Sequence, residues 1–332
     1  MKRASIKDIA KLAGVSVATV SYVLNKKEGS RIGEATREKI LEIAETINYI
    51  PNKMARSLKT NKSKLIGLIV ADISNDFYSG MARYIEDEAM KLGYTLLIGS
   101  SDENPAKFKK LTELFSEQQV DGMIIAPVMD SDETVQKLIN DQFPVVTVDR
   151  YLTHTAVAGV RVNNDEVSEE VCRFLAGKKF KEIAYVGYDT RLPHLLDRQQ
   201  GFEQQSEKEK VQIQKILVGL DNIAGEVHQG LDLYFQNSNN RKAVYFSSNK
   251  LAVAGLAYFI QKNIRVPEDV SVIAFDETDA YSLFPVEIDY IQQPLDEMAK
   301  TAVQLLDDQI NGQPSRKSMI FPARLIHKKS VQ

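Results

Sequence analysis

The sequence lacks most of the features that mark secreted and membrane proteins. Its 332 residues include a single cysteine, Cys172, so no disulfide can form within the chain, which agrees with a reducing compartment. We interpret Cys172 as a packed core thiol rather than a reactive one. The apolar runs, such as residues 65–71, are too short to span a bilayer, and residues 1–15 contain no continuous apolar segment like that of a secretory signal. The sequence therefore predicts a cytoplasmic protein without a membrane segment.

Motifs for catalysis are also missing. The chain has no Gly-rich phosphate loop of the Walker type, no Gly-x-Ser-x-Gly nucleophile turn and no cluster of cysteine and histidine. Its histidines show no metal-ligand spacing: His154, His194, His228 and His327. We therefore predict no enzyme activity, no metal and no cofactor.

Charge is distributed unevenly along a chain of otherwise ordinary composition. With 43% apolar and 26% charged residues, 332 residues fit two or three globular domains. The net charge is −3, but residues 1–60 carry 12 Lys and Arg against 6 Asp and Glu, which leaves −9 for residues 61–332. A basic head on an acidic body favours a polyanion such as DNA as partner, although a small domain can also carry extra lysines by chance.

The first helix pattern lies near the N-terminus and ends at a glycine. Gly14 can adopt the left-handed conformation that closes a helix, Val15 can fill the angle between two helices, and Ser16 can cap the next one. The pattern therefore predicts a tight helix-turn-helix. The apolar residues that define its first helix recur at i, i+3, i+4 and i+7: Ile6, Ile9, Ala10 and Ala13.

The second helix is the candidate DNA-reading element. Small outward residues would let its backbone approach the groove floor and touch thymine methyl groups, while a serine and a tyrosine can donate to phosphates or base edges. A third helix, entered through Ile32 and Gly33, closes a minimal core. Residues predicted to face inward are Val20, Val23 and Leu24 in the second helix, with Ile40, Ile43, Ala44 and Ile47 in the third; those facing outward are Val17, Ala18, Ser21, Tyr22 and Asn25.

Helix-turn-helix spacing alone is moderately specific, since many helical hairpins share it, but three longer blocks strengthen the prediction. They are residues 6–21 followed by Val23-Leu24-Asn25, then Thr36-Arg37-Glu38-Lys39-Ile40, then Asn48-Tyr49-Ile50-Pro51-Asn52. These blocks closely resemble the head of the LacI/GalR family of bacterial transcription regulators. The resemblance implies a repressor that grips palindromic operator DNA as a homodimer. Many members have arginine where this chain has Tyr22, so the operator half-site would differ there.

The same resemblance implies a hinge after the third helix. Residues 52–59 can form a short helix that is marginal alone in water, and in similar proteins such helices pair across the dimer in the minor groove, where a leucine matching Leu58 wedges between base steps. The alternative is an ordinary flexible linker. The full set of expected DNA-contacting residues is Ser5, Ser16, Val17, Ala18, Thr19, Ser21, Tyr22, Asn25, Asn52, Ala55, Arg56 and Leu58.

From Lys64 onward, short apolar runs alternate with amphipathic stretches, which is typical of βαβ units in doubly wound sheets. Ligands of such sheets collect at the carboxyl ends of the strands, so the residues just after each strand are the candidates for a binding site. The predicted strands are Leu65–Ala71, Tyr94–Gly99, Met123–Ala126, Val145–Val148, Ile183–Gly187, Ala243–Phe246 and Val270–Phe275, with Ile320–Ile326 as the last.

Polar residues at these strand ends suit a hydroxyl-rich ligand. Asp149, Asn249 and Asp276 offer acceptors and mixed donor-acceptors, and Arg198, placed at a strand-helix junction, could fork onto hydroxyls, a carboxylate or a phosphate. Taken singly, each is better explained as a helix cap or a surface ion pair. The family resemblance, which covers nearly the whole chain, places them among effector-pocket motifs. The expected effector-binding residues are Asp76, Phe77, Tyr78, Asp149, Arg150, Arg198, Asn249 and Asp276.

The expected architecture is therefore an all-α helix-turn-helix head plus an α/β periplasmic-binding-protein-like body of two doubly wound lobes. The head would span residues 1–50, the hinge and linker 51–61, and the effector-binding and dimerisation domain 62–332. Within that domain, lobe N would comprise about 62–160 and 291–320, and lobe C about 161–290 and 321–332. Because the chain ends at Gln332 without a heptad-bearing extension, a dimer is expected rather than a tetramer.

Effector identity stays open at this point. Asp149-Arg150-Tyr151-Leu152 is similar to regulators of sucrose and fructose use, and a cation at Arg150 beside Arg198 would suit a sugar phosphate. A nucleobase and a protein corepressor are further alternatives. Two rival classes are a sugar-binding transport receptor, which the body alone would support equally, and a sugar-processing enzyme. The basic head argues against the first, and the missing catalytic motifs argue against the second.

Overall fold

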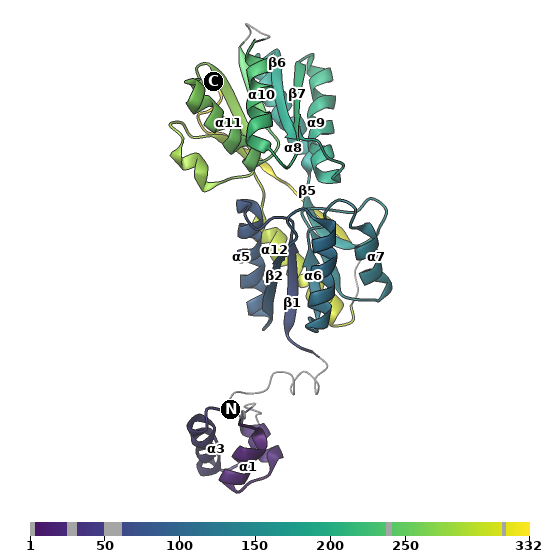
Figure 1. The fold of residues 1–332 in the computed structure, drawn as a ribbon, viewed down its shortest axis with the longest axis vertical. Helices are drawn as coiled ribbons and strands as arrows, with labels where there is room; N and C mark the ends of the chain where they lie inside the picture. The colour runs from purple at the N-terminus through teal and green to yellow at the C-terminus, as the bar shows by residue number, and fades with distance from the viewer. Residues whose placement is uncertain (1–3, 25–31, 50–61, 237–240, 314–316) are drawn as a thin grey trace. The chain divides into compact units, whose positions relative to one another are not determined.

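The computed structural model describes residues 4–24, 32–49, 62–236, 241–313 and 317–332. The chain divides into two compact units, Met1–Ser63 and Lys64–Gln332, which we call the head and the body (Figure 1). Over the described ranges, no helix combines the length and apolar character needed to cross a membrane.

The head is a three-helix unit around a small core. Its helices are α1 (Ile6–Ala13), α2 (Val17–Leu24) and α3 (Glu34–Thr46). Their inward faces bury a compact set of side chains, as the helical spacing predicts: Ile9, Ala10, Ala13, Val20, Val23, Ile40 and Ala44.

The turn between α1 and α2 has the chemistry expected from its sequence. Gly14 adopts φ 73°, and its N–H donates to the carbonyl of Ala10. The N–H of Thr19 donates to Oγ of Ser16 at 3.1 Å, so Ser16 caps α2. Val15 packs against the core of the head. Glycine, apolar plug and serine cap therefore fix the angle between the two helices, and the predicted helix-turn-helix is confirmed.

The body contains two six-stranded sheets. The first has the order β11-β5-β4-β3-β1-β2 and the second β12-β10-β9-β8-β6-β7. All strand pairs are parallel except β10 with β12, which is antiparallel. The strands are β1 (Leu65–Val70), β2 (Thr95–Ser100), β3 (Gly122–Ile125), β4 (Val145–Val148), β5 (Ala158–Val162), β6 (Glu182–Tyr188), β7 (Gln212–Val218), β8 (Lys242–Phe246), β9 (Val270–Phe275), β10 (Asp289–Gln292), β11 (Ser318–Phe321) and β12 (Arg324–Ile326).

Helices follow most strands, as expected for βαβ units. We call the first sheet and its helices the N lobe, and the second sheet and its helices the C lobe; several helices and strands of each are labelled in Figure 1. Helices of the N lobe are α5 (Asp76–Lys91), α6 (Pro105–Glu117), α7 (Asp132–Asn140) and α12 (Leu295–Ile310); those of the C lobe are α8 (Asn164–Gly177), α9 (Pro193–Glu209), α10 (Ile223–Gln236) and α11 (Asn249–Lys262), with the short 3-10 helix η1 (Asp279–Leu283).

The chain crosses between the lobes three times, after β5, after β10 and between β11 and β12. The predicted final strand over Ile320–Ile326 was wrong in one respect, because it is two strands that belong to different sheets. Pro322 lies between them, and proline cannot donate to a strand ladder. The third crossing is therefore built where one continuous strand was expected.

The sequence pattern did not predict three of the strands: β5, β7 and β10. β7 is an edge strand that reads Gln-Ile-Gln-Lys-Ile-Leu-Val, with Gln212 and Lys215 exposed, so it lacks the continuous apolar run that marks a central strand. β5 and β10 are short, at 5 and 4 residues. β3 and β4 are equally short but almost wholly apolar and were predicted, whereas β5 contains an arginine and β10 an aspartate and a glutamine, so neither shows a continuous apolar run.

Candidate functional site

A cleft of about 740 Å³ lies between the two lobes of the body, which we call the interlobe cleft. Its walls come from the carboxyl ends of strands in both sheets, where ligands of such sheets collect. Polar lining residues that follow a strand end directly or within three positions are Asp72 (after β1), Asp102 and Glu103 (β2), Asp149 and Arg150 (β4), Asp189 and Thr190 (β6), Asp221 (β7), Ser248 (β8), Asp276 (β9) and Gln293 (β10).

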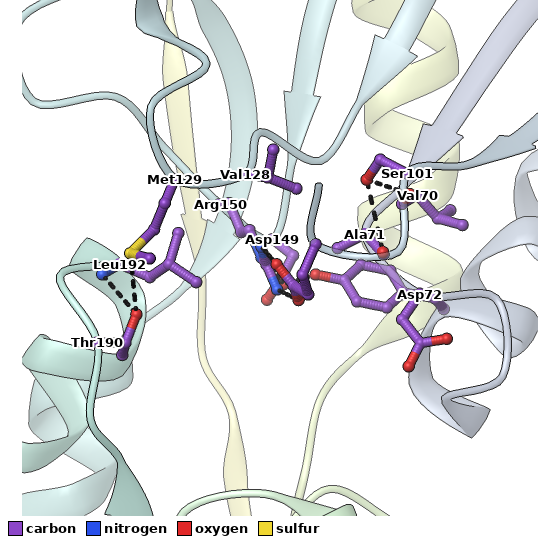
Figure 2. A network of polar contacts seen from close by, with 12 residues as sticks. Val70, Ala71, Asp72, Ser101, Val128, Met129, Asp149, Arg150, Thr190 and Leu192 are labelled. Carbon is purple, nitrogen blue, oxygen red and sulfur yellow. Dashed lines mark hydrogen bonds and ion pairs between the residues drawn. The ribbon is translucent and has the colours of Figure 1, made fainter. Parts of the chain in front are cut away.

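Asp149 sits at the centre of the N-lobe wall. It follows β4 in a left-handed conformation, φ 66°, which turns its carboxylate away from the strand direction. Its Oδ2 accepts a hydrogen bond from the hydroxyl of Tyr78 on α5 at 2.8 Å, and its Oδ1 is buried without a partner in the described part of the chain. Burial raises the pKa of Asp149, and Arg198 and Arg150 act against that rise. The residue therefore presents an open acceptor to the cleft (Figure 2).

Arg150 forms an ion pair with a carboxylate of its own lobe. Its Nη1 donates to Glu103 Oε2 at 2.8 Å and its Nη2 to Glu103 Oε1 at 2.5 Å, a bidentate pair. Nη1 also donates to the carbonyl of Pro127 at 3.2 Å, and only Nε is left buried without a hydrogen-bond partner among the described residues. The expectation that Arg150 would add a cation beside Arg198 overlooked Glu103, which neutralises it.

Arg198 comes from the C lobe and is held on three sides. Nε donates to Asn164 Oδ1 at 2.7 Å, Nη1 donates to the carbonyl of Ser247 at 2.8 Å, and the guanidinium carbon lies 3.3 Å from the centre of the Phe275 ring. The residue lies inside α9 rather than at the strand-helix junction expected from the sequence. Its Nη2 has no protein partner within the described ranges, so Arg198 can donate to a ligand.

A glycine brings Arg198 to this position. Gly201 on α9 faces α8 so closely that a Cβ there would lie 2.3 Å from the carbonyl oxygen of Asp165. This approach of the two helices lets the Arg198 side chain reach Asn164 at the start of α8. The Arg-Gln-Gln-Gly-Phe segment therefore supplies both the functional cation and the close packing that orients it.

Asp276 and Gln293 form a second acceptor group on the floor of the cleft. Asp276 follows β9 with φ 71°, and its Oδ1 accepts from Nε2 of Gln293 at 2.6 Å. Burial raises the pKa of Asp276 to about 6, although Arg198 and the Gln293 hydrogen bond both lower it. Oε1 of Gln293 is buried without a partner in the described residues. Asp276 therefore changes charge near neutral pH.

His194 adds a neutral imidazole. It lies in the first turn of α9, buried, with Nδ1 lacking a hydrogen-bond partner among the described residues. Burial holds its pKa well below the usual range, and the nearby Arg150 and Arg198 lower it further. Four of the six buried side-chain atoms without a partner in the described chain thus belong to cleft-lining residues: Asp149 Oδ1, Arg150 Nε, His194 Nδ1 and Gln293 Oε1.

Two of the expected effector residues do not line the cleft, while Phe77 joins Tyr78 there as the expected apolar wall. Asp76 is exposed on the outer side of α5 and accepts a hydrogen bond from the hydroxyl of Thr278, a contact between the lobes. Asn249 donates from Nδ2 to Asn75 Oδ1 at 2.9 Å, again between the lobes. Both residues join the lobes instead of facing the cavity, because hydrogen-bond partners from the opposite lobe lie within reach.

Sequence reasoning missed several cleft residues. Glu103 and Asp189 follow β2 and β6, so the strand-end rule would have found them once those ends were placed. Lys250 pairs with Asp72 and donates to Ser74 Oγ at 3.1 Å across the lobes, and it is the neighbour of the predicted Asn249. Gln293 directly follows β10, a strand that the sequence pattern did not predict, and His194 lies in the first turn of α9, where no local signal marks it.

The head presents a second candidate surface on α2. Val17, Ala18 and Tyr22 are exposed, and Ser21 is half-buried. Ser16 and Thr19 bond each other through their hydroxyls at 2.9 Å, and Ser5 Oγ donates to Asp8 at 2.7 Å at the start of α1. The remaining expected DNA contacts lie outside the described residues: Asn25, Asn52, Ala55, Arg56 and Leu58.

Comparison with known proteins matches both units. Residues 5–52 match the family of bacterial regulatory proteins of the lacI type, and residues 172–331 match the periplasmic binding protein-like domain. The sucrose operon repressor of Klebsiella pneumoniae is 32% identical over 98% of each chain. The transcriptional regulator RegA of Clostridium saccharobutylicum is 31% identical over 92% of each. The lac repressor dimer, solved with operator and an anti-inducer, superposes with a TM-score of 0.87 at 22% identity, over 99% of each chain.

Proposed function

Since the chain belongs to the LacI family of bacterial transcription regulators, we propose that it represses carbohydrate-utilisation genes and responds to a neutral, hydroxyl-rich effector in the interlobe cleft. The observation that carries the effector assignment is the set of four buried polar atoms without partners that belong to the residues lining the cleft. Buried polar groups in folded proteins are almost always hydrogen-bonded, so such a concentration favours a polar ligand.

The operator is read by α2. Its exposed Val17 and Ala18 carry short apolar side chains that fit against thymine methyl groups, and Tyr22 offers a hydroxyl for a phosphate or a base edge. The caps at Gly14 and Ser16 hold this helix firmly against the head core. A rigid helix with small outward residues is the geometry that helix-turn-helix proteins place in the major groove.

The effector is a ligand whose groups both donate and accept. Asp149 Oδ1 and Gln293 Oε1 are acceptors that need donors, whereas Arg150 Nε and the free Nη2 of Arg198 are donors that need acceptors. A hydroxyl group satisfies both kinds, and several hydroxyls on a compact ring satisfy them together. Phe77 and Tyr78 supply the apolar wall for the carbon face of such a ring.

Electrostatics favour a neutral sugar over a sugar phosphate. The cleft is lined by seven carboxylate residues and only three cationic ones. Each cation already contacts protein: Arg150 holds Glu103, Lys250 holds Asp72, and Arg198 holds Asn164 and the Ser247 carbonyl. A phosphate dianion would enter a cavity whose carboxylates outnumber its cations, where Arg198 is the one described cationic lining residue without a carboxylate hydrogen-bond partner, and this costs Coulomb energy that a hydroxyl does not.

Effector binding is coupled to the lobes, because the cleft draws its walls from both. Asp149 and Arg150 belong to the N lobe, and Arg198 and Asp276 to the C lobe. A ligand that bridges them stabilises one lobe arrangement over another and so shifts the population competent for DNA. The regulator acts in the cytoplasm as a homodimer.

An apolar surface for the homodimer is present on the N lobe. Tyr84, Met90 and Leu92 on and just after α5, and Ile98 on edge strand β2, are exposed large apolar side chains. An edge strand flanked by apolar residues is normally covered in a folded protein. A second copy of the chain provides that cover.

The test is operator affinity with and without sugar. Duplexes bound by the purified full chain are selected from a random library, and binding of the best duplex is measured by fluorescence anisotropy at fixed salt, with each member of a panel of neutral sugars. We expect one sugar to change the affinity roughly 5- to 150-fold, the usual range of allosteric coupling. Sugars that do not raise the melting temperature serve as controls. Equal affinities with every sugar that binds would contradict the allosteric claim, and no preferred duplex would contradict the regulator itself.

A further inference from the structure

A second cavity, of about 880 Å³, adjoins the interlobe cleft. We call it the side cavity. Its N-lobe wall is α7 and the segment from Tyr151 to Thr155, and its C-lobe wall is the segment from Arg191 to Pro193. Two residues, Met129 and Leu192, line both the side cavity and the interlobe cleft. The cavities are therefore neighbours that share a wall made of two side chains.

This shared wall is a contact between the lobes. Met129 follows β3 of the N lobe, and Leu192 precedes α9 of the C lobe. Thr190 joins them: its hydroxyl lies 3.5 Å from the Met129 sulfur and accepts from the N–H of Leu192 at 3.2 Å (Figure 2). Methionine has an unbranched, flexible side chain. The partition can therefore open by rotation of side chains.

The interior of the side cavity is suited to a neutral amphipathic ligand. Pro127 and Leu152 contribute apolar surface, and Gln136 and Thr155 contribute an amide and a hydroxyl that bond each other at 3.4 Å. The charge of Arg191 is paired with Asp130 at 3.2 Å. The other charged lining residues are exposed: Asp132, Glu133, Lys137, Asp141 and His154.

From this geometry we infer that the effector is a carbohydrate of at least two sugar units, with one unit in the interlobe cleft and the next in the side cavity beyond Met129 and Leu192. The inference rests on the proposed function and deepens it. The first unit meets Asp149, Arg198 and Asp276, which are the groups that need partners. The second unit meets apolar surface and neutral polar groups, which match the two faces of a sugar ring.

The experiment compares ligand length in the wild-type full chain and a variant. Isothermal titration calorimetry measures the affinities of fructose, sucrose and raffinose, and of glucose, maltose and maltotriose. Gln136→Trp on α7 fills the side cavity and leaves the interlobe cleft unchanged, because Gln136 lines only the former. Lys110→Trp, on the exposed face of α6 and outside both cavities, is the matched control for an added indole.

We expect one series to show a gain of about tenfold or more in affinity from the first to the second or third sugar unit, equivalent to one or two added hydrogen bonds. Gln136→Trp removes that gain and leaves the monosaccharide affinity within about twofold, while Lys110→Trp changes neither. A monosaccharide that binds as tightly as its longer homologues, or a gain that survives Gln136→Trp, overturns the two-unit inference alone. If no sugar of any length binds, the result contradicts both the proposed effector class and the two-unit inference.

Discussion

The head and the interlobe cleft satisfy their polar groups in opposite ways. In the described part of the head, no buried side-chain polar atom lacks a hydrogen bond, and the residues of α2 that we propose to read DNA lie on the surface of a packed core. In the cleft, four buried polar atoms have no protein partner. The head therefore presents its α2 side chains on a core whose buried polar atoms are hydrogen-bonded. The cleft, in contrast, leaves buried polar atoms whose hydrogen bonds a ligand can supply.

This difference has an energetic meaning. An unpaired buried donor or acceptor costs about 1–3 kcal/mol, so each of these four atoms favours a ligand that supplies its partner. Asp102, Glu103, Asp149 and Asp276, all cleft residues, also adopt the left-handed backbone region that non-glycine residues avoid. Strain and unpaired atoms of this kind persist at functional sites. In the described part of the head, Asn48 alone among non-glycine residues adopts this region and no buried side-chain polar atom lacks a partner, so local sequence signals are enough to form its helices.

The variant with the largest expected effect on the cleft, and none on the head, is Arg198→Lys. Lysine keeps the charge but cannot make the forked contacts to Asn164 and the Ser247 carbonyl while still donating into the cleft. We expect the affinity for the neutral sugar to fall about 100-fold, or about 3 kcal/mol, with operator affinity in the absence of sugar within about twofold of wild type. Calorimetry measures the first quantity and anisotropy the second.

Arg173→Lys, on the exposed side of α8, is the control for the same exchange away from the cleft. A loss of sugar affinity smaller than about threefold for Arg198→Lys would show that the guanidinium is structural and does not touch the effector.

Two valine variants of α2 separate the stability of the head core from DNA reading. Val20 is fully buried and Val17 is 41% exposed, on the same helix. Val20→Ala opens a cavity in a small core and should lower the free energy of unfolding of the head by about 2 kcal/mol. Val17→Ala should cost at most about 0.5 kcal/mol but change the base sequence selected from a duplex library. Hydrogen exchange of head amides reports stability.

Sugar affinity should be unchanged in both valine variants, because neither residue belongs to the body. If Val17→Ala selected the same duplexes as the wild type with the same affinity, α2 would not be the reading helix.

A smaller expected effect is a dependence of sugar affinity on pH. Because burial raises the pKa of Asp276 to about 6, its carboxylate is ionised at pH 7 and largely protonated at pH 5. Protonation removes an acceptor for ligand hydroxyls, so sugar affinity should fall about tenfold from pH 7 to pH 5. The raised pKa has the opposite sign for folding: it stabilises the protein below the unfolded pKa, and this contribution is lost as pH rises through about 6.

Asp276→Asn is the matching control, since an amide of the same shape does not titrate over this range. Its sugar affinity should be lower and flat from pH 5 to pH 7. A pH profile as steep in Asp276→Asn as in the wild type would assign the effect to another group.

The head could be read almost completely from the sequence, and the cleft only in part. Helical spacing, Gly14 and Ser16 are local signals, and they determined the helices and their buried faces. Strand ends pointed correctly to Tyr78, Asp149 and Asp276 because parallel strands share one edge. The sequence could not predict hydrogen-bond partners from distant segments. Glu103 pairs with Arg150 over a separation of 47 positions, and Asn75 accepts a hydrogen bond from Asn249 over a separation of 174.

The most direct test of the central claim uses a single neutral sugar that shifts operator affinity, together with its 6-phosphate, both titrated into the full chain by calorimetry at pH 7. The unpaired acceptors and the committed cations of the cleft predict that the neutral sugar binds at least about tenfold more tightly than its phosphate ester. Tighter binding of the phosphate ester would contradict the account, because it would show that the cations of the cleft, Arg198 above all, outweigh its seven carboxylates.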